Sequence, residues 1–314
     1  YNMSYNILVT GGAGYLGSIM VPDLLAAGHK ITVLDNFMFK QTSLNHCCYH
    51  KNFTVVKGDI RQKDIVSKLM KKADVIIPLA ALVGAPLCSL DPIGASTINH
   101  DAIELMLRLL SKDQIVLMPT TNSAYGTGDK DNYCNEESPL RPISQYAIEK
   151  VEIEKELMQN SNAISFRLAT VFGMSPRMRI DLLVNDFTYR AVNDRFVVLF
   201  ESHFKRNYIH IRDVSRVFQH ALNNHNSMKG EIYNVGLSDA NVSKKELCEY
   251  IQKQVPGFIF IDEQIGKDPD QRNYIVSNEK IEETGFKTEF SLDWGIGELL
   301  KGYTMIKNSR YGNV

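Results

Sequence analysis

The sequence predicts an α/β protein in which a doubly wound parallel sheet is followed by a smaller, mixed α/β lobe. Three observations carry this prediction. Short runs of β-branched and apolar residues alternate with stretches of helical spacing as far as Gly173. The runs are apolar at consecutive positions, which is typical of strands buried on both faces. The first run ends at a cluster of glycines that opens a helix.

The elements of the first part follow in strict alternation. Helical stretches are expected at residues 19–27, 63–72, 98–110 and 145–158. The first of them stops at Gly28, a residue that often ends helices. The runs expected to form strands are residues 6–10, 31–34, 53–56, 75–79, 115–118 and 164–168.

The alternation becomes irregular after Gly173. Residues 181–192 and 214–222 have helical spacing, and residues 196–200, 208–211 and 232–235 have strand character. Further elements are expected at residues 244–252, 258–261, 278–283 and 292–303. We therefore expect a nucleotide-binding domain at residues 1–173 and a substrate-binding lobe at residues 174–314, part of which can return to the first domain. A cleft between the two is the expected ligand site.

Composition excludes several classes of protein. Among 314 residues, 35 Lys and Arg balance 36 Asp and Glu, so no broad positive field attracts a nucleic acid or an anionic membrane. The longest uncharged run, residues 75–90, is short for a membrane span and contains prolines. The five cysteines show no disulfide or zinc spacing, and the N-terminus shows no secretory signal, so we expect a cytoplasmic protein. The histidines are poorly spaced for a metal, and none is expected.

The glycine cluster has the spacing of a turn that binds a dinucleotide in a Rossmann fold. Gly11 allows a tight turn, Gly14 lets a pyrophosphate approach the backbone, and Gly17 lets the helix pack closely on the sheet. The motif is weak by itself, because glycine turns also occur for structural reasons. Asp35 at the end of the second strand strengthens it, since a carboxylate there accepts hydrogen bonds from ribose hydroxyls and repels a 2′-phosphate. NAD is therefore favoured over NADP.

Both acidic residues that follow strands also have a structural interpretation. Asp35 could serve only as a helix cap or turn residue. Asp59, at the end of the next strand, could reach the adenine amine or could simply end its strand.

Tyr146 and Lys150 are spaced to share one face of a helix. A phenol beside an ammonium can have its pKa lowered toward neutrality, which would make Tyr146 a usable general base. Such pairs are common on solvent-facing helices, which is the alternative interpretation. Thr121 favours the catalytic one, because it ends the fifth strand and so places a hydroxyl at the edge of the sheet where such folds bind ligands.

Taken together, these motifs resemble the extended short-chain dehydrogenase/reductase family, specifically its branch that acts on nucleotide sugars. The resemblance covers essentially the whole chain. It rests on residues 10–17, 34–36, 58–61, 79–81, 99, 121–126, 146–150, 167–173, 206–210, 213–214, 233–236 and 272.

The resemblance implies roles for individual residues. Tyr146 would take the proton from a sugar hydroxyl, usually at C4, while the hydrogen on that carbon leaves as hydride to NAD. Lys150 would hold the nicotinamide ribose, and Thr121 would bind the same sugar oxygen. The residues implied to hold NAD are Gly11, Gly14, Tyr15, Leu16, Gly17, Asp35, Asn36, Asp59, Ile60, Leu79, Ala80, Ala81, Asn99, Tyr146 and Lys150. Those implied to hold the nucleotide-diphosphate sugar are Thr121, Asn122, Ser123, Arg177, Asn185, Arg206 and Arg272.

Departures from the family pattern narrow the reaction. The 4,6-dehydratases carry Asp-Glu after the catalytic threonine, where this chain has Asn122 and Ser123, neither of which transfers protons near neutral pH. Ser123 also replaces the cysteine of the mannose 3,5-epimerases. Two readings remain, oxidation at C4 with release of the ketone, and 4-epimerisation with NAD kept bound.

The chain as a whole is similar to enzymes that modify GDP-linked heptoses for polysaccharide biosynthesis, in particular GDP-manno-heptose 4-dehydrogenases. A binding protein that responds to NAD(H) without turnover is the alternative from another class. The apolar faces at residues 102–110 and 151–158 predict a homodimer through a four-helix bundle, unless each face is covered by its own sheet.

Overall fold

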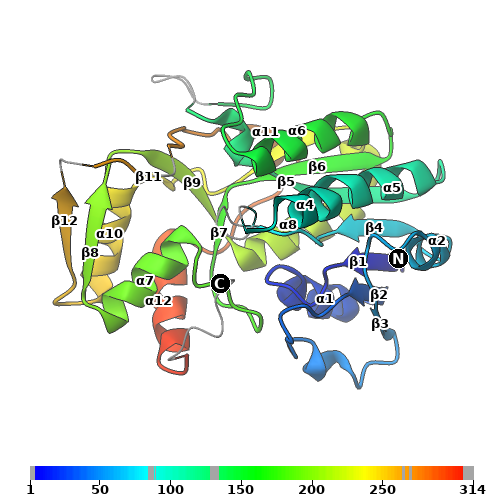
Figure 1. Cartoon of the computed structure of the whole chain (residues 1–314), viewed down its shortest axis with the longest axis horizontal. Helices are drawn as coiled ribbons and strands as arrows, with labels where there is room; N and C mark the ends of the chain where they lie inside the picture. Colours follow the sequence, from blue (N-terminus) through cyan, green and yellow to red (C-terminus); the bar gives the residue numbers. More distant parts are fainter. Residues whose placement is uncertain are drawn as a thin grey trace.

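A seven-stranded parallel sheet forms the centre of the molecule in this computed structural model (Figure 1). The structure describes residues 4–83, 88, 90–127, 134–263, 266–268 and 271–306. The strand order is β10-β6-β5-β4-β1-β2-β3, with chain order reversing beside β1, as in a doubly wound Rossmann fold. The strands are β1 (Asn6–Thr10), β2 (Lys30–Asp35), β3 (Phe53–Lys57), β4 (Val75–Pro78), β5 (Ile115–Thr121), β6 (Ala163–Leu168) and β10 (Ile232–Val235). The predicted fold class is confirmed.

Helices cover both faces of this sheet, which explains why its strands are apolar at consecutive positions. On one face, α1 (Gly17–Ala26) packs beside α8 (Ile211–Asn223). On the other face, α2 (Lys63–Met70) packs on α5 (Ala102–Leu109), which packs on α6 (Gln145–Leu157). The expected helix at residues 98–110 begins earlier, at α4 (Pro92–Ser96), where Asp91 caps Gly94 N and Pro92 occupies the first turn. A π-helical turn, η2 (Thr97–Asp101), joins α4 to α5.

The second part of the chain forms a smaller lobe at one end of the molecule (Figure 1). Its sheets are three-stranded, in the order β11-β9-β7, and two-stranded and parallel, β12-β8. Its strands are β7 (Thr170–Phe172), β8 (Phe196–Phe200), β9 (Lys205–His210), β11 (Asn241–Ser243) and β12 (Ile259–Glu263). Its helices are α7 (Leu183–Asn193), α10 (Lys244–Gln254) and α12 (Leu292–Tyr303). Short elements elsewhere are η1 (Asn45–Cys47), η3 (Asn122–Tyr125), α9 (His225–Met228) and α11 (Glu279–Glu283).

The chain returns to the large sheet after it has entered the second lobe. β10 pairs with β6, with Ile232 opposite Ser165, and α8 packs against α1. Residues 211–235 therefore belong to the large sheet and to the helices that cover it, although they follow α7 and β8 in sequence. The second lobe is discontinuous, and its packing against the sheet forms the walls of the functional cavity.

The apolar stripes of α5 and α6 are partly covered by their own sheet. Ile103 and Met106 of α5, and Ile153 and Leu157 of α6, are buried in the same hydrophobic cluster. Arg108, Glu152 and Lys155 are exposed on these helices, and Leu105, Leu107 and Leu109 of α5 are partly exposed. Part of each stripe is therefore used within the chain, and the homodimer stays a prediction.

The two-stranded sheet of the second lobe has an exposed apolar face. Along β8 and β12, alternate side chains point to solvent, and Val198 lies opposite Ile261 in register. The exposed apolar residues of this face are Phe196, Val198, Phe200, Ile259 and Ile261.

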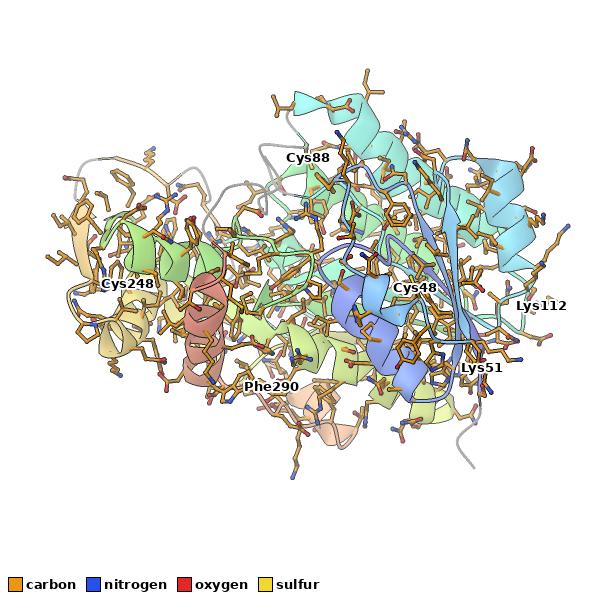
Figure 2. The ribbon with its side chains drawn as sticks, turned by 90° about the horizontal axis from the view of Figure 1, so that it is seen from below. Cys48, Lys51, Cys88, Lys112, Cys248 and Phe290 are labelled. Atoms are coloured by element: carbon orange, nitrogen blue, oxygen red, sulfur yellow. The ribbon has the colours of Figure 1, made fainter. Side chains whose placement is uncertain are left out.

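Two further features bear on the expected protein class. All five cysteines are free thiols, and Figure 2 shows Cys48, Cys88 and Cys248 in separate parts of the molecule. Within the described ranges, no helix combines the length and the apolar character that a membrane crossing requires.

Candidate active site

A cavity of about 890 Å³ lies at the carboxyl edge of the large sheet and extends to the second lobe. Both parts of the chain line it, as expected for a topological switch point. The predicted site residues that line it are Gly11, Gly14, Tyr15, Leu16, Gly17, Asp35, Asn36, Asp59, Ile60, Leu79, Ala80, Ala81, Asn99, Thr121, Ser123, Tyr146, Lys150, Arg177, Arg206 and Arg272. Two predicted site residues, Asn122 and Asn185, do not.

The glycine turn fits between β1 and α1 only without side chains. Gly11 has φ +66°, and a Cβ on it would lie 2.6 Å from the backbone of Ala80. A Cβ on Gly17 would lie 2.3 Å from the carbonyl oxygen of Gly12. Such distances are shorter than any tolerable contact, so these glycines are required by backbone packing.

The start of α1 fits the pyrophosphate of a dinucleotide. Leu16 at the N-cap position provides no capping side chain, and the first turn contains no acidic residue. Ser18 N and Ile19 N donate to the carbonyls of Gly14 and Leu16, and the positive end of the helix dipole favours an anion in front of this turn. The residues at this turn therefore fit NAD.

Asp35 has a structural role and also lines the cavity. Its carboxylate accepts hydrogen bonds from Ala13 N at 3.0 Å and from Phe37 N at 2.8 Å, so it closes the glycine turn. Burial raises the pKa of Asp35 above its ordinary value. Because each carboxylate oxygen can accept more than one bond, Asp35 can still receive ribose hydroxyls from the cavity.

Asp59 is engaged by its neighbour. Its carboxylate accepts bonds from the backbone N and the Nε of Arg61, both at 2.9 Å, and from Nη2 at 2.7 Å. These bonds lower the pKa of Asp59. The carboxylate ends β3 at the cavity wall, as the sequence predicted, but in the structure it binds Arg61.

Tyr146 and Lys150 lie on the cavity face of α6, whose start is capped by the Ser144 side chain at Ala147 N. Lys150 is 4% exposed, and its Nζ lies 5.8 Å from the centroid of the Tyr146 ring. Burial lowers the pKa of Lys150 to about 8. Burial also raises the pKa of Tyr146 to about 12, opposed by the charges of Arg179 and Arg272.

The expected lowering of the Tyr146 pKa is therefore wrong for the structure without ligands. The physical reason is that desolvation favours the neutral phenol. The Lys150 ammonium lies over the ring instead of forming a hydrogen bond with the hydroxyl. A cation close to the Tyr146 oxygen would oppose this effect of burial.

Thr121 is connected to Arg272 through Ser123. The Thr121 hydroxyl donates to Ser123 Oγ at 2.9 Å and accepts from Ser123 N at 3.0 Å. Arg272 Nη1 donates to the same Ser123 Oγ at 2.5 Å. The hydroxyl at the end of β5 and the guanidinium from residue 272 thus meet at one side chain, although 151 residues separate them in sequence.

The structure places two predicted substrate residues, Asn122 and Asn185, outside the lining of the cavity. Asn122 is fully buried, and its amide has no hydrogen-bond partner in the described part of the chain. Asn185 accepts a bond from Gly173 N at 3.0 Å and donates to Tyr15 Oη at 3.2 Å. Asn185 is on the expected helix, and its amide joins the glycine turn to the second lobe.

Cationic side chains gather on the second wall of the cavity. Arg206 is 4% exposed on β9, and Arg272 follows Gln271 on the opposite segment. Cζ of Arg177 lies 4.5 Å from the centroid of the Phe39 ring. Nη2 of Arg179 forms an ion pair with Oδ2 of Asp181 at 2.5 Å. A planar guanidinium suits phosphate oxygens, so this wall can hold a diphosphate.

Sequence reasoning missed Glu149 and Gln145, which line the cavity beside Tyr146 and Lys150. Their signal was available, because residues three and four apart on a helix share one side. It also missed Arg179 and Phe39 as wall residues, for which the sequence offered no spacing signal.

The chain matches known proteins over most of its length. Residues 7–236 match the model of the family described as "NAD dependent epimerase/dehydratase family". A putative UDP-glucose 4-epimerase of Methanocaldococcus jannaschii is 27% identical over 307 residues, covering 92% of this chain and 95% of that protein.

Solved structures show the same fold. A dTDP-glucose 4,6-dehydratase from Bacillus anthracis, in complex with NAD, has a TM-score of 0.82 at 22% identity over 98% of this chain and 99% of that one. A UDP-glucuronic acid 4-epimerase from Bacillus cereus, in complex with UDP-glucuronic acid and NAD, has a TM-score of 0.83 at 22% identity. The match covers 96% of this chain and 99% of that one.

Proposed function

Since the chain belongs to the NAD dependent epimerase/dehydratase family, we propose that it oxidises C4 of a sugar linked to a nucleoside diphosphate. It is an NAD-dependent enzyme, and the proposed product is a 4-keto sugar nucleotide. The observation that carries the proposal is that Thr121, Tyr146 and Lys150 share one cavity with the glycine turn and with Arg206 and Arg272.

The proposed chemistry divides between the cofactor and the chain. Bound NAD supplies the acceptor for the hydride that leaves C4. Tyr146 as phenolate accepts the proton of the C4 hydroxyl, and Thr121 binds the same oxygen. Lys150, charged below its pKa of about 8, is the nearby cation that can favour the phenolate. Arg206 and Arg272 hold the diphosphate, so that the sugar extends toward Tyr146.

The residues after Thr121 support oxidation without dehydration. Loss of water next to the 4-ketone requires an acid and a base beside the sugar. Asn122 lies outside the cavity and Ser123 is a hydroxyl held between Thr121 and Arg272. We therefore favour a 4-dehydrogenase or a 4-epimerase over a 4,6-dehydratase.

The alternative function is a 4-epimerase that keeps NAD bound. The relative from Methanocaldococcus jannaschii, named as a putative UDP-glucose 4-epimerase, favours this reading. Both reactions begin with the same oxidation and use the same residues. They differ in whether the ketone is released or is reduced again from its other face. For the substrate we propose a GDP-linked heptose or hexose, which rests on the resemblance drawn from the sequence.

One incubation separates these readings. The purified protein is mixed with NAD and a panel of GDP-, UDP- and dTDP-linked hexoses and heptoses, and NADH absorbance and product mass are followed. A net rise in NADH with a product two hydrogens lighter supports the dehydrogenase. An isomer of unchanged mass without net NADH supports the epimerase, and a product that has lost water supports the dehydratase. Binding of NAD without turnover of any sugar would leave only a non-catalytic binding protein.

A further inference from the structure

Glu149 is a buried carboxylate that the proposed chemistry does not use. It is 4% exposed, lies on α6 between Tyr146 and Lys150 in sequence, and lines the same cavity. In the described part of the chain its one hydrogen bond comes from Gln145 Nε2, at a long 3.3 Å. Within the same part of the chain it has no ion pair within 4 Å. Buried carboxylates are normally paired or hydrogen-bonded, because their desolvation is unfavourable. The single long bond to Glu149 therefore indicates that a ligand supplies further hydrogen-bond donors.

The position of Glu149 in the cavity indicates which group of the ligand donates these hydrogen bonds. Glu149 lies three residues after Tyr146 and one before Lys150 on α6, and all three residues line the cavity. Glu149 therefore lies at the end of the cavity where hydrogen is transferred. The phosphate-binding arginines line the second wall, and a phosphate would be repelled by a carboxylate. The donors that remain at this end are hydroxyls, either of the substrate sugar or of the nicotinamide ribose that Lys150 would hold.

We propose that Glu149 accepts a hydrogen bond from a hydroxyl of the substrate sugar other than the one that is oxidised. It thereby restricts the enzyme to uncharged, polyhydroxylated sugars and excludes uronates. This inference rests on the proposed function and makes its substrate class narrower. The exclusion follows because a second carboxylate at this end of the cavity would meet Glu149 with an unfavourable like-charge interaction. One structural neighbour, by contrast, is a UDP-glucuronic acid 4-epimerase.

The test compares Glu149→Gln and Glu149→Ala with the wild type and with Glu152→Gln. Glu152 is on the same helix but exposed, so it controls for a general change in helix charge. The substrates are the neutral sugar nucleotide with the highest turnover and its uronate counterpart on the same base, such as GDP-mannose with GDP-mannuronate or UDP-glucose with UDP-glucuronate. Turnover is measured with NAD, binding by calorimetry, and folding by Tm.

We expect the wild type to bind the neutral sugar nucleotide and to reject the uronate. In Glu149→Ala, kcat/KM for the neutral sugar should fall by about 10- to 100-fold, the loss of a charge-assisted hydrogen bond. In Glu149→Gln, uronate binding should strengthen by at least about tenfold, because the like charge is gone. Glu152→Gln should behave as the wild type on both compounds. The affinity for NAD should not change.

Three results would overturn the inference while leaving the proposed function intact. Glu149 variants with wild-type selectivity would show that no sugar group contacts it. Weaker NAD binding with unchanged sugar selectivity would assign Glu149 to the cofactor. An equal loss of kcat for every sugar, with a shifted pH profile, would show that Glu149 acts only through Lys150. If the wild type oxidises none of the neutral sugar nucleotides, the proposed function fails first.

Discussion

The two walls of the cavity are built in different ways. The wall at the carboxyl edge of the large sheet consists of backbone and of side chains that directly follow strands, such as the turn at Gly11 and the carboxylate of Asp35. The wall at the second lobe consists of guanidinium groups from distant segments, with Arg206 on β9 and Arg272 beyond β12. The wall at the sheet edge can be predicted from residues that are neighbours in sequence. A wall assembled from distant side chains depends on how the lobes pack.

The largest effect is expected from Tyr146, which lies between the two walls and is the proposed proton acceptor. Tyr146→Phe should lower kcat by about 10²- to 10⁴-fold, because the proton acceptor is lost. NAD binding, followed by fluorescence titration, should stay within about twofold of the wild type, since the ring and the glycine turn are kept. Activity near the wild-type level would contradict the catalytic assignment of Tyr146.

The local wall is broken most directly at Gly11. In Gly11→Ala, a Cβ would meet the Ala80 backbone at 2.6 Å, in a residue whose φ is +66°. Strain of about 1–3 kcal/mol is expected in the fold, visible as a lower Tm. NAD affinity should weaken by at least about tenfold because the turn must shift. Gly28→Ala is the matched control, since Gly28 also has positive φ but nothing lies within 4 Å of its Cβ. It should lower Tm without changing the Kd of NAD.

The assembled wall is tested by Arg272→Ala. Loss of a charge-assisted bond to phosphate should raise the Kd of the sugar nucleotide by about 10- to 100-fold. The Kd of NAD should be unaffected if the two walls are independent. Arg108→Ala, at an exposed position of α5, is the control. Equal weakening of NAD and sugar nucleotide would show that the walls act as one unit.

Lys150 connects both walls, and its burial makes stability depend on pH. Its pKa is about 8 in the folded chain against an ordinary 10.5, so between these values the unfolded chain binds the additional proton. Stability should therefore rise with pH across this window. Lys150→Met should remove that rise and gain about 1–3 kcal/mol below pH 8, while turnover is lost. Urea titrations at pH 7 and 9 measure both effects, and parallel pH slopes in the two proteins would contradict the prediction.

The smallest effect is expected far from both walls, on the exposed face of β8 and β12. Val198→Thr and Ile261→Thr replace outward side chains that are 41% and 49% exposed. Each should change the free energy of unfolding by no more than about 0.5 kcal/mol and leave kcat unchanged. A much larger loss of stability, measured by urea titration at several protein concentrations, would show that this face is buried in an assembly.

The sequence predicted the local wall well because its information lies in neighbouring residues. Glycine spacing, the acidic residues after β2 and β3, and the helical spacing of Tyr146 and Lys150 all translate into geometry through periodicities of the backbone. The apolar stripes of α5 and α6 show the limit of such reasoning. An apolar stripe predicts that one face of a helix is buried. Whether the sheet of the same chain or a second subunit covers that face depends on packing.

What the sequence by itself determined is the parallel α/β fold, the dinucleotide turn and the cavity edge that carries Thr121, Tyr146 and Lys150. Only the tertiary structure decided that Asn122 and Asn185 do not line the cavity, that Arg272 meets Thr121 through Ser123, and that Glu149 is buried beside them. It also decided that burial raises the pKa of Tyr146. The physical reason is that contact, burial and desolvation are properties of the surroundings of a side chain, and those surroundings come from segments that are remote in sequence.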